Sequence, residues 1–394
     1  MKVLITGAKG FMGRNLCAAF EEIGNGHDKR AAHRIEDLEV YQYDIDNTPE
    51  DLERFCKDCD FVLNLAGVNR PKDNAEFMAG NFGFASTLLD TLKKYGNKCP
   101  VMLSSSIQAS LEGRYAGSEY GLSKKAGEDL FFSYGKETGA EVLVYRFPNA
   151  FGKWCRPNYN SAIATFCHNT ANGLPIQVND PSVDMDLVYI DDIAEEMIQA
   201  IRGNANRLPS GYCQVPVHYE CKLGWAADTI QSFAELNAKL AIPELADPLT
   251  KKLYATYLSY LPADKFGYEL TKNEDSRGSF TEIIRTNGCG QFSVNISKPE
   301  ETKGNHWHNT KSEKFIVVSG SALIRLRRIG LDENGEKYPV VEYYVDGKTP
   351  ESVEMIPGYT HSIKNLSDTE DLVTLMWASE AFDPDRPDTF YQEV

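Results

Sequence analysis

Residues 1–13 restrict the possible fold more than any other part of the chain. A short apolar run at residues 3–6 leads directly into Gly7, Gly10 and Gly13, and a helical pattern follows. Glycines at this spacing allow a tight turn, let the backbone approach a pyrophosphate and let a helix pack closely on a strand. The order of strand, glycine loop and helix favours a dinucleotide-binding turn. A glycine-rich turn without a ligand is the plainer alternative.

The hydrophobic pattern changes character near Gly267. Before it, short apolar runs alternate with segments of helical periodicity, which is typical of a parallel sheet covered by helices on both faces. The apolar runs are residues 3–6, 61–66, 101–104 and 142–145, and the helical segments include residues 51–56 and 87–95. After it, the runs are separated by turn residues, which indicates an all-β barrel or jelly roll. These later runs are residues 315–318, 322–328, 340–345, 352–356 and 372–377.

We therefore predict two domains in this chain of 394 residues. Residues 1–245 are expected to form an α/β Rossmann-like domain with a substrate-binding subregion. Residues 246–266 are expected to connect it to an all-β domain of residues 267–394.

The acidic composition excludes two classes of partner. The chain has 41 Lys and Arg against 57 Asp and Glu, a formal net charge of −16. Nucleic acid or an anionic membrane surface would require a basic face. No segment approaches the roughly 20 apolar residues that cross a bilayer, and the apolar start is too short for a signal peptide. The nine cysteines are odd in number and scattered, which is typical of reduced thiols in a cytosolic protein.

Three strand ends supply candidate cofactor contacts. The glycine loop contributes Gly7, Lys9, Gly10, Phe11, Met12 and Gly13. Asp44 and Ile45 follow an apolar run, where the carboxylate can accept a hydrogen bond from an adenine amino group or remain a solvated loop residue. Asn64, Ala66 and Gly67 end a later strand. The carboxyl ends of parallel strands meet at one sheet edge, where cofactors bind in doubly wound folds.

Tyr120 and Lys124 suggest proton transfer to a carbonyl group. Their spacing of four places both side chains on one face of a helix. A tyrosine phenol has an ordinary pKa near ~10, so we expect the ammonium of Lys124 to lower the pKa of Tyr120. Three serines at residues 104–106 close a strand and can supply a hydroxyl to the carbonyl. Tyr115 is the rival tyrosine, but Glu119 follows it by four residues and would raise its pKa.

In this order, the motifs resemble the extended short-chain dehydrogenase/reductase family. The resemblance covers residues 1–245 and includes Arg-Phe-Pro-Asn at 146–149 and Val-Tyr-Ile-Asp-Asp at 188–192. It implies that Ser106 positions a ketone, that Tyr120 donates the proton and that Lys124 supports the cofactor ribose. The gap between Ser106 and Tyr120 is shorter than in many members, and Ser105 is therefore an alternative to Ser106.

Three of the seven histidines gather in the predicted all-β domain. His306 and His308 are two residues apart, and so they face the same side of a strand. Glu313 can return on the next strand and His361 on a later one. Three imidazoles and one carboxylate suit a borderline divalent ion such as zinc or iron.

The histidine spacing resembles the two motifs of the cupin family, at residues 304–320 and 357–365. Pro357 and Gly358 are adjacent, where the family usually has one residue between them. A reductase of the first family fused to a metal-binding cupin is a narrow combination. It resembles bifunctional enzymes that make nucleotide-linked amino sugars for capsular polysaccharide or O-antigen. The stretches that carry this likeness are residues 104–109, 151–160, 257–262 and 304–320.

That resemblance implies both the substrate and the cofactor. The cupin would invert carbon 3 of a UDP-2-acetamido-2,6-dideoxy-hexos-4-ulose, and the reductase domain would reduce its carbon 4 ketone with NADPH. Candidate substrate contacts are Asn149, Arg156 and Asn160. Candidate partners of the extra phosphate of NADPH are Lys9, Arg30 and Arg34. A homodimer is the default expectation.

Three other interpretations stay open at this point. The first is an NAD-dependent nucleotide-sugar epimerase or dehydratase that retains its cofactor, with a cupin that only binds sugar. The second is a redox sensor, which would have little reason to keep both Tyr120 and Lys124. The third is a dioxygenase activity of the cupin, because iron uses the same ligands as zinc.

Overall fold

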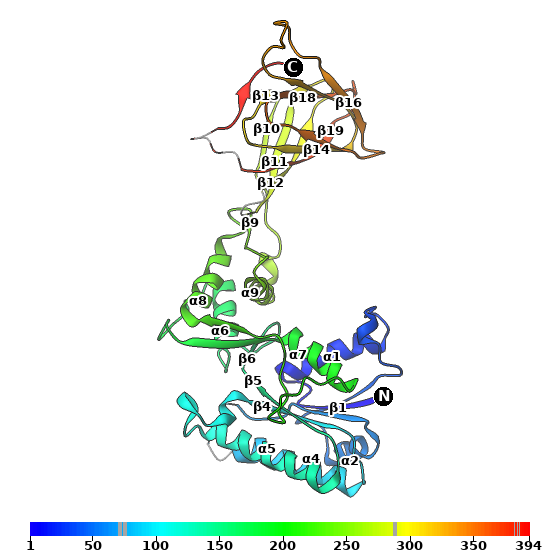
Figure 1. Ribbon diagram of the computed structural model, residues 1–394, viewed down its shortest axis with the longest axis vertical. Helices are drawn as coiled ribbons and strands as arrows, with labels where there is room; N and C mark the ends of the chain where they lie inside the picture. The colour runs from blue at the N-terminus through cyan, green and yellow to red at the C-terminus, as the bar shows by residue number, and fades with distance from the viewer. Residues whose placement is uncertain (70–72, 74–76, 287–289, 382, 384, 386) are drawn as a thin grey trace. The chain divides into compact units, whose positions relative to one another are not determined.

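The chain forms two compact units (Figure 1). The computed structural model describes residues 1–69, 73, 77–286, 290–381, 383, 385 and 387–394. The first unit contains residues 1–231 and 252–262, and the second contains residues 232–251 and 263–394. The boundary crosses helix α9 (Pro248–Leu258), which lies within the segment predicted as the connection, residues 246–266.

A five-stranded parallel sheet in the order β2-β1-β3-β4-β5 forms the centre of the first unit. Its strands are β1 (Lys2–Thr6), β2 (Glu39–Tyr43), β3 (Phe61–Asn64), β4 (Val101–Ser106) and β5 (Val142–Phe147). The predicted apolar runs are therefore strands of the expected parallel sheet. Because the strands run in one direction, their carboxyl ends lie along one edge of the sheet, where the site residues gather.

Helices cover both faces of this sheet, as Figure 1 shows. They are α1 (Phe11–Gly24), α2 (Pro49–Asp58), α4 (Phe84–Lys94), α5 (Glu119–Thr138) and α7 (Ile190–Ile201). α2, α4 and α5 pack side by side on one face, and α1 packs against α7 on the other. Ser118 starts α5 by accepting a hydrogen bond from the Gly121 amide, and Gly139 ends it with a φ of 76°.

A small three-stranded sheet extends the first unit beyond β5. It contains β6 (Asn149–Phe151), β7 (Asp184–Tyr189) and β8 (Tyr219–Lys222), with β6 parallel and β8 antiparallel to β7. Helices α6 (Ala162–Ala171) and α8 (Leu223–Ser232) follow β6 and β8 along the chain.

The second unit consists of two facing β-sheets. Its strands are β9 (Ala241–Ile242), β10 (Lys272–Asp275), β11 (Gly278–Thr286), β12 (Gly290–Ser297), β13 (Thr302–Trp307), β14 (Glu313–Ser319), β15 (Ser321–Arg328), β16 (Val341–Asp346), β17 (Ser352–Met355), β18 (Tyr359–Asn365), β19 (Leu372–Ala378) and β20 (Phe390–Tyr391). One sheet has the order β10-β11-β12-β19-β14-β17, with β9 beside β11, and the other has the order β16-β15-β18-β13-β20. Phe315, Ile324, Met355 and Ile363 are part of the core between them.

The all-β expectation for the second unit is confirmed, and all five predicted runs are strands. After residue 267, the predicted apolar runs did not include β10 to β13, β18 or β20, although the histidine spacing placed His306 on a strand. β10 is exposed on both faces, and so its sequence carries no alternation of apolar and polar residues. Among the described residues, none of the helices is long and apolar enough to cross a bilayer.

Candidate active site and metal centre

The glycine loop forms one wall of a cavity of about 1320 Å³ in the first unit. Gly7 has a φ of 68°, and a Cβ there would lie 2.8 Å from the Ala66 nitrogen. A Cβ at Gly13 would lie 2.1 Å from the Gly7 oxygen, so neither position tolerates a side chain. Gly10 is the N-cap of α1, with no side-chain cap and no acidic residue in the first turn. The amide groups of this turn are therefore available to an anion.

Asp44 holds the glycine loop in place. Its carboxylate accepts hydrogen bonds from the backbone amides of Lys9 at 2.7 Å and Ile45 at 2.8 Å. The ammonium of Lys9 pairs with Asp46. The side chain of Ile45 is 98% exposed at the cavity, which is unusual for an aliphatic residue and suits the face of a flat ring.

Two of the three predicted residues at the end of β3 reach the cavity. Ala66 and Gly67 line the cavity, but the predicted contact Asn64 does not. Asn64 is buried below, where it accepts a hydrogen bond from the Thr6 hydroxyl at 2.6 Å, and so it supports the loop instead of reaching a cofactor. Sequence reasoning missed Asn81, in the π-helix Met78–Gly83.

Asn81 fastens the loop after β3 to helix α5. Its amide exchanges two hydrogen bonds of 3.0 Å with the backbone of Val68 and donates a third, also 3.0 Å, to the Ser123 hydroxyl. A short π-helix often marks a functional site. The π-helix itself could have drawn attention to Asn81. Because hydrophobic periodicity does not reveal a π-helix, this feature could not be recognised from the sequence.

Ser106, Tyr120 and Lys124 all line this cavity. The Lys124 nitrogen lies 5.8 Å from the centre of the Tyr120 ring and donates to the Ser104 carbonyl oxygen at 3.0 Å. Tyr115 does not line the cavity, and its hydroxyl accepts a hydrogen bond from Arg114 at 2.8 Å.

The pKa of Tyr120 differs from the expectation. Burial raises it to about 12, and a hydrogen bond with Ser106 opposes this only partly. Burial also lowers the pKa of Lys124 to about 8, although the carboxylate of Glu128 favours its charged form. The expected net lowering of the Tyr120 pKa is therefore not found, because burial of the phenol is the largest influence on it and Lys124 is not among the groups that shift it.

The two candidate serines differ in their hydrogen bonding, because Ser105 belongs to a buried ionic network. Ser105 donates a hydrogen bond to Glu128 at 2.6 Å, on the side of β4 away from Ser106. Glu128 is fully buried and accepts two hydrogen bonds from the Arg146 guanidinium, at 2.8 and 2.7 Å. The Ser105 hydroxyl is thus already engaged. Ser106 remains the better candidate to hold a carbonyl.

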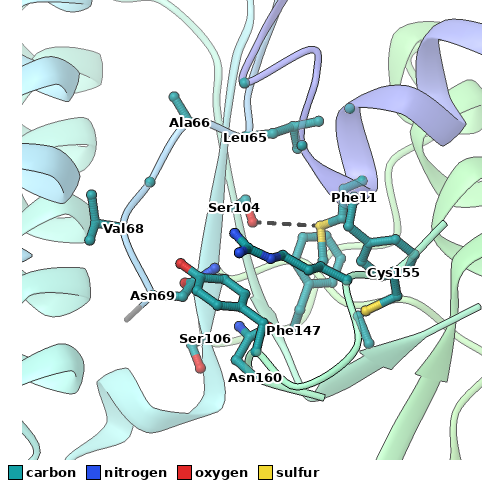
Figure 2. A pocket seen from close by; sticks show the side chains of 18 of the residues that line it. Phe11, Leu65, Ala66, Val68, Asn69, Ser104, Ser106, Phe147, Cys155 and Asn160 are labelled. Atoms are coloured by element: carbon teal, nitrogen blue, oxygen red, sulfur yellow. Dashed lines mark hydrogen bonds between the residues drawn. The ribbon is translucent and has the colours of Figure 1, made fainter. Parts of the chain in front are cut away.

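The predicted substrate contacts Asn149, Arg156 and Asn160 all line the same cavity. Figure 2 shows Asn160 and Ser106 among the side chains around it. All three are exposed, and Asn149 also donates a hydrogen bond to the Asp186 carbonyl oxygen at 3.0 Å.

Of the three predicted phosphate partners, only Lys9 lines the cavity. Arg30 pairs with Asp28 at 2.7 Å, and Arg34 lies 3.6 Å from Glu36. Sequence reasoning missed Arg14, an exposed cation in the first turn of α1 that lines the cavity and has no ion-pair partner among the described residues. Its place directly after Gly13 was the available signal.

In the second unit, the four predicted metal ligands come together. One ligand atom from each of His306, His308, Glu313 and His361 lies within 4.8 Å of the others. His306 on β13 pairs in register with His361 on β18, and Glu313 begins β14 in the opposite sheet. The Nε2 atoms of His308 and His361 lie 3.5 and 3.4 Å from Oε2 of Glu313.

The chemistry of this cluster fits a divalent ion. The Nε2 atoms of His308 and His361 and Oε2 of Glu313 are buried and have no hydrogen-bond partner within the described part of the chain, and such a group of atoms is costly to bury unless something binds them. Burial, together with His361, lowers the pKa of His306 to about 4, which keeps it neutral as a ligand must be. Burial alone would raise the pKa of Glu313, but His308, His361 and Lys311 hold it well below its usual range.

A second cavity, of about 340 Å³, lies beside Glu313 inside the second unit. Its lining residues are Phe280, Glu282, Arg285, Gln291, Ser293, Lys311, Glu313, Met376 and Ala378. The polar side chains of Gln291 and Ser293 are buried at this cavity. Apolar and hydrogen-bonding groups are therefore mixed in a space that suits a small hydroxylated ring.

The eight described cysteines are free, and Cys289 lies outside the described residues. Cys56 and Cys59 are three residues apart, a spacing seen in some metal sites, but among the described residues they belong to no group of three or more potential metal ligands. The Cys59 sulfur lies 3.8 Å from that of Cys99.

A glycine cradle at the first strand-to-helix turn, with a Tyr–Lys pair at the same sheet edge, defines a nucleotide-dependent oxidoreductase of the short-chain dehydrogenase/reductase type. Residues 3–212 match the NAD dependent epimerase/dehydratase family, and residues 273–390 match the polysaccharide biosynthesis C-terminal domain. The chain belongs to the NAD dependent epimerase/dehydratase family.

Known relatives resemble the whole chain. It is 39% identical over 390 residues to UDP-2-acetamido-2,6-beta-L-arabino-hexul-4-ose reductase of Pseudomonas aeruginosa, covering 99% of this chain and 98% of the relative. It matches the crystal structure of the capsular polysaccharide assembling protein CapF from Staphylococcus aureus with a TM-score of 0.88, 45% identity and full coverage of both chains. A UDP-glucuronic acid 4-epimerase from Bacillus cereus, at 20% identity and a TM-score of 0.51 over 66% of this chain and 98% of that one, shares the fold.

Proposed function

We propose that this chain is a bifunctional nucleotide-sugar enzyme. The second unit inverts carbon 3 of a UDP-2-acetamido-2,6-dideoxy-hexos-4-ulose, and the first unit reduces the carbon 4 ketone with NADPH. The product is UDP-N-acetyl-L-talosamine, which leads to UDP-N-acetyl-L-fucosamine for capsular polysaccharide or O-antigen. The observation that carries the proposal is the group of Ser106, Tyr120 and Lys124 in one cavity with the glycine loop.

Two relatives that cover the full chain support this substrate. One is named as a reductase of a UDP-linked 4-keto amino sugar, and the other is named for capsular polysaccharide assembly. The similarity to both relatives includes the second unit. The proposal therefore assigns a function to the second unit as well as to the first.

In the reduction, the residues of the first unit hold the ketone and supply the proton. NADPH, when bound, supplies the hydride. The hydroxyls of Ser106 and Tyr120 donate hydrogen bonds to the carbon 4 oxygen, and Tyr120 passes its proton to that oxygen as negative charge develops there. Lys124 faces the ring of Tyr120 and offsets the charge of the resulting phenolate. Exposed Arg156 and Asn160 are placed to contact the diphosphate or the sugar.

The cations at the cavity favour NADPH over NADH. The amides at the start of α1 suit the pyrophosphate, and the exposed side chain of Ile45 suits one face of the adenine. Lys9 and Arg14 both line the cavity next to this turn and can hold the additional phosphate.

The second unit is proposed to be a metal-binding cupin. His306, His308, Glu313 and His361 would hold a divalent ion, with zinc as the first candidate, and the ion would supply Lewis-acid stabilisation of negative charge. A ketone at carbon 4 acidifies the hydrogen on carbon 3, which can leave and return on the opposite face. The 340 Å³ cavity would hold the sugar ring, with Gln291 and Ser293 as partners for its hydroxyl or amide groups.

The direct test uses the purified chain with the UDP-linked 4-keto sugar in deuterated water. Without NADPH, we expect deuterium at carbon 3 of the recovered substrate. With NADPH, we expect stoichiometric NADPH oxidation and a product that is heavier by one deuterium on carbon. Exchange without NADPH consumption would contradict the reductase, and consumption without exchange would contradict the epimerase.

A further inference from the structure

The segment of residues 387–394 runs alongside the histidine cluster. Within it, β20 pairs antiparallel with β13, so that Tyr391 lies opposite His306 and Phe390 lies opposite Trp307. The rings of Trp307 and Phe390 stack with centroids 4.8 Å apart. β20 is thus an extra edge strand on the sheet that carries His306 and His361, and His308 follows directly after β13.

Asp388 binds the loop between two of the metal ligands. Its carboxylate accepts hydrogen bonds from the backbone amides of Asn309 at 2.9 Å, Thr310 at 2.8 Å and Lys311 at 3.0 Å. The Thr310 hydroxyl donates a fourth, at 3.2 Å. These contacts hold the pKa of Asp388 well below its usual range, although burial opposes them. This one side chain therefore fixes the path of the loop from His308 to Glu313.

The backbone of Asp388 also determines which ring nitrogen of His308 carries the hydrogen. The Nδ1 atom of His308 donates a hydrogen bond to the Asp388 carbonyl oxygen. A hydrogen on Nδ1 leaves the lone pair on Nε2, the atom that lies 3.5 Å from Glu313. A backbone carbonyl on the far nitrogen is the usual way in which proteins orient a metal-binding imidazole.

The same segment contacts the neighbours of the other two histidines. The amide of Gln392 donates to the carbonyl oxygen of Asn305, next to His306, at 2.9 Å. The hydroxyl of Thr360, next to His361, donates to the Gln392 carbonyl oxygen. Asn305 has a φ of 58°, an uncommon conformation for a residue other than glycine, and so it depends on such contacts.

From these contacts we propose that residues 387–394 are part of the metal site, and that Asp388 is the positioning residue that gives it affinity. The inference rests on the proposed metal centre of the second unit. No sequence motif predicts this role of Asp388, because Asp388 is far along the chain from His308. The segment touches His308 directly, the neighbours of His306 and His361, and the loop that leads to Glu313.

The test compares zinc binding by three variants of the full chain with binding by the unaltered protein. Asp388→Asn preserves shape but places an NH₂ group against backbone amides, and we expect the dissociation constant for zinc to rise about 10- to 100-fold. Phe390→Ala removes only the ring stack, and we expect a smaller rise. Asp346→Asn is the matched control, since its carboxylate also accepts hydrogen bonds from backbone amides, those of Lys348 and Thr349, but lies outside residues 387–394, and it should bind zinc like the unaltered chain.

Two measurements separate positioning from general damage. Zinc affinity is measured by competition with a chromophoric chelator, and the absorption spectrum of the cobalt-loaded protein reports ligand geometry. A spectrum altered in Asp388→Asn supports the proposal, and Phe390→Ala provides the same comparison if Asp388→Asn does not fold. Unchanged affinity and spectrum in both variants would overturn it. An unaltered chain that binds no zinc would instead overturn the proposed metal centre.

Discussion

The two sites differ in how much of their chemistry is assembled before a ligand arrives. In the first unit, Tyr120 lines an open cavity of about 1320 Å³, and burial raises its pKa to about 12. In the second unit, four ligand atoms already lie within 4.8 Å of one another, beside a cavity of about 340 Å³. A site built from fixed strands can be assembled in advance. In a site formed by loops and one face of a helix, the bound nucleotide and substrate complete the arrangement of charges.

The largest expected effect tests whether the two sites work separately. Tyr120→Phe removes the proton donor, and we expect NADPH oxidation to fall by a factor of about 10² to 10⁴. Deuterium exchange at carbon 3 should continue, because we propose that it takes place in the second unit. Absorbance measures the first reaction and mass spectrometry the second.

Tyr115→Phe is the matched control, because Tyr115 is close in sequence but does not line the cavity. It should leave both reactions unchanged. If Tyr120→Phe stops exchange as well, the division between the two units is wrong.

The next effect concerns the assembled site. His361→Ala removes a fully buried ligand, and we expect zinc affinity to fall by about a hundredfold or more, since the loss of a supporting contact alone costs 10- to 100-fold. Metal content after dialysis measures the loss. His27→Ala, an exposed histidine paired with Glu22, should retain the metal, and full zinc content in His361→Ala would show that the cluster is not the site.

A pH series tests whether burial lowers the pKa of Lys124 in the first site. The folded-state pKa of Lys124, about 8, lies below the ordinary 10.5. Between these values the unfolded chain binds more protons, so this lysine makes stability rise with pH through that window. Against Lys124→Met, we expect the unaltered chain to gain about 3 kcal/mol in free energy of unfolding from pH 8 to 10.5.

Urea unfolding of both proteins across this range provides the measurement. Lys125→Met, which removes a less buried ammonium from the same helix, is the control. Parallel stability curves for Lys124→Met and the unaltered chain would contradict the burial of a titrating ammonium.

The smallest expected effect concerns cofactor choice. Arg14→Ala should reduce the preference for NADPH over NADH about tenfold in kcat/KM, because a charged hydrogen bond to a phosphate contributes about 1.5 kcal/mol. Arg30→Ala should have no effect, because Arg30 pairs with Asp28 and does not line the cavity. An unchanged preference in Arg14→Ala would remove Arg14 from the phosphate contacts.

The sequence predicted those parts of each site that depend on local spacing. Tyr120 and Lys124 lie on one helix face because backbone periodicity alone dictates it. The spacing of His306 and His308 also predicted that they come together, although His308 lies just after β13, which ends at Trp307. The spacing of the glycines predicted the glycine loop in the same way. Helix α1 begins at Phe11, before the last glycine of the loop rather than after it, since Gly10 itself serves as the cap.

The rest depended on contacts between distant segments. Asn64 was expected at the cofactor but is bound to Thr6 beneath the cavity. The pKa of Tyr120 depends on how deeply the fold buries the phenol, and no spacing reveals this. Asp388 reaches His308 only because β20 pairs with β13, a pairing between segments that carry no shared motif.

The distribution of the four ligands over two sheets has a mechanical consequence. β13 and β18 carry histidines in one sheet, and Glu313 starts β14 in the other. An ion held by all four would cross-link the sheets without any covalent bond between their side chains. Removal of the ion would then allow the two sheets to separate more easily. Resistance to proteases, rather than catalysis alone, would therefore measure how well the cell supplies the metal.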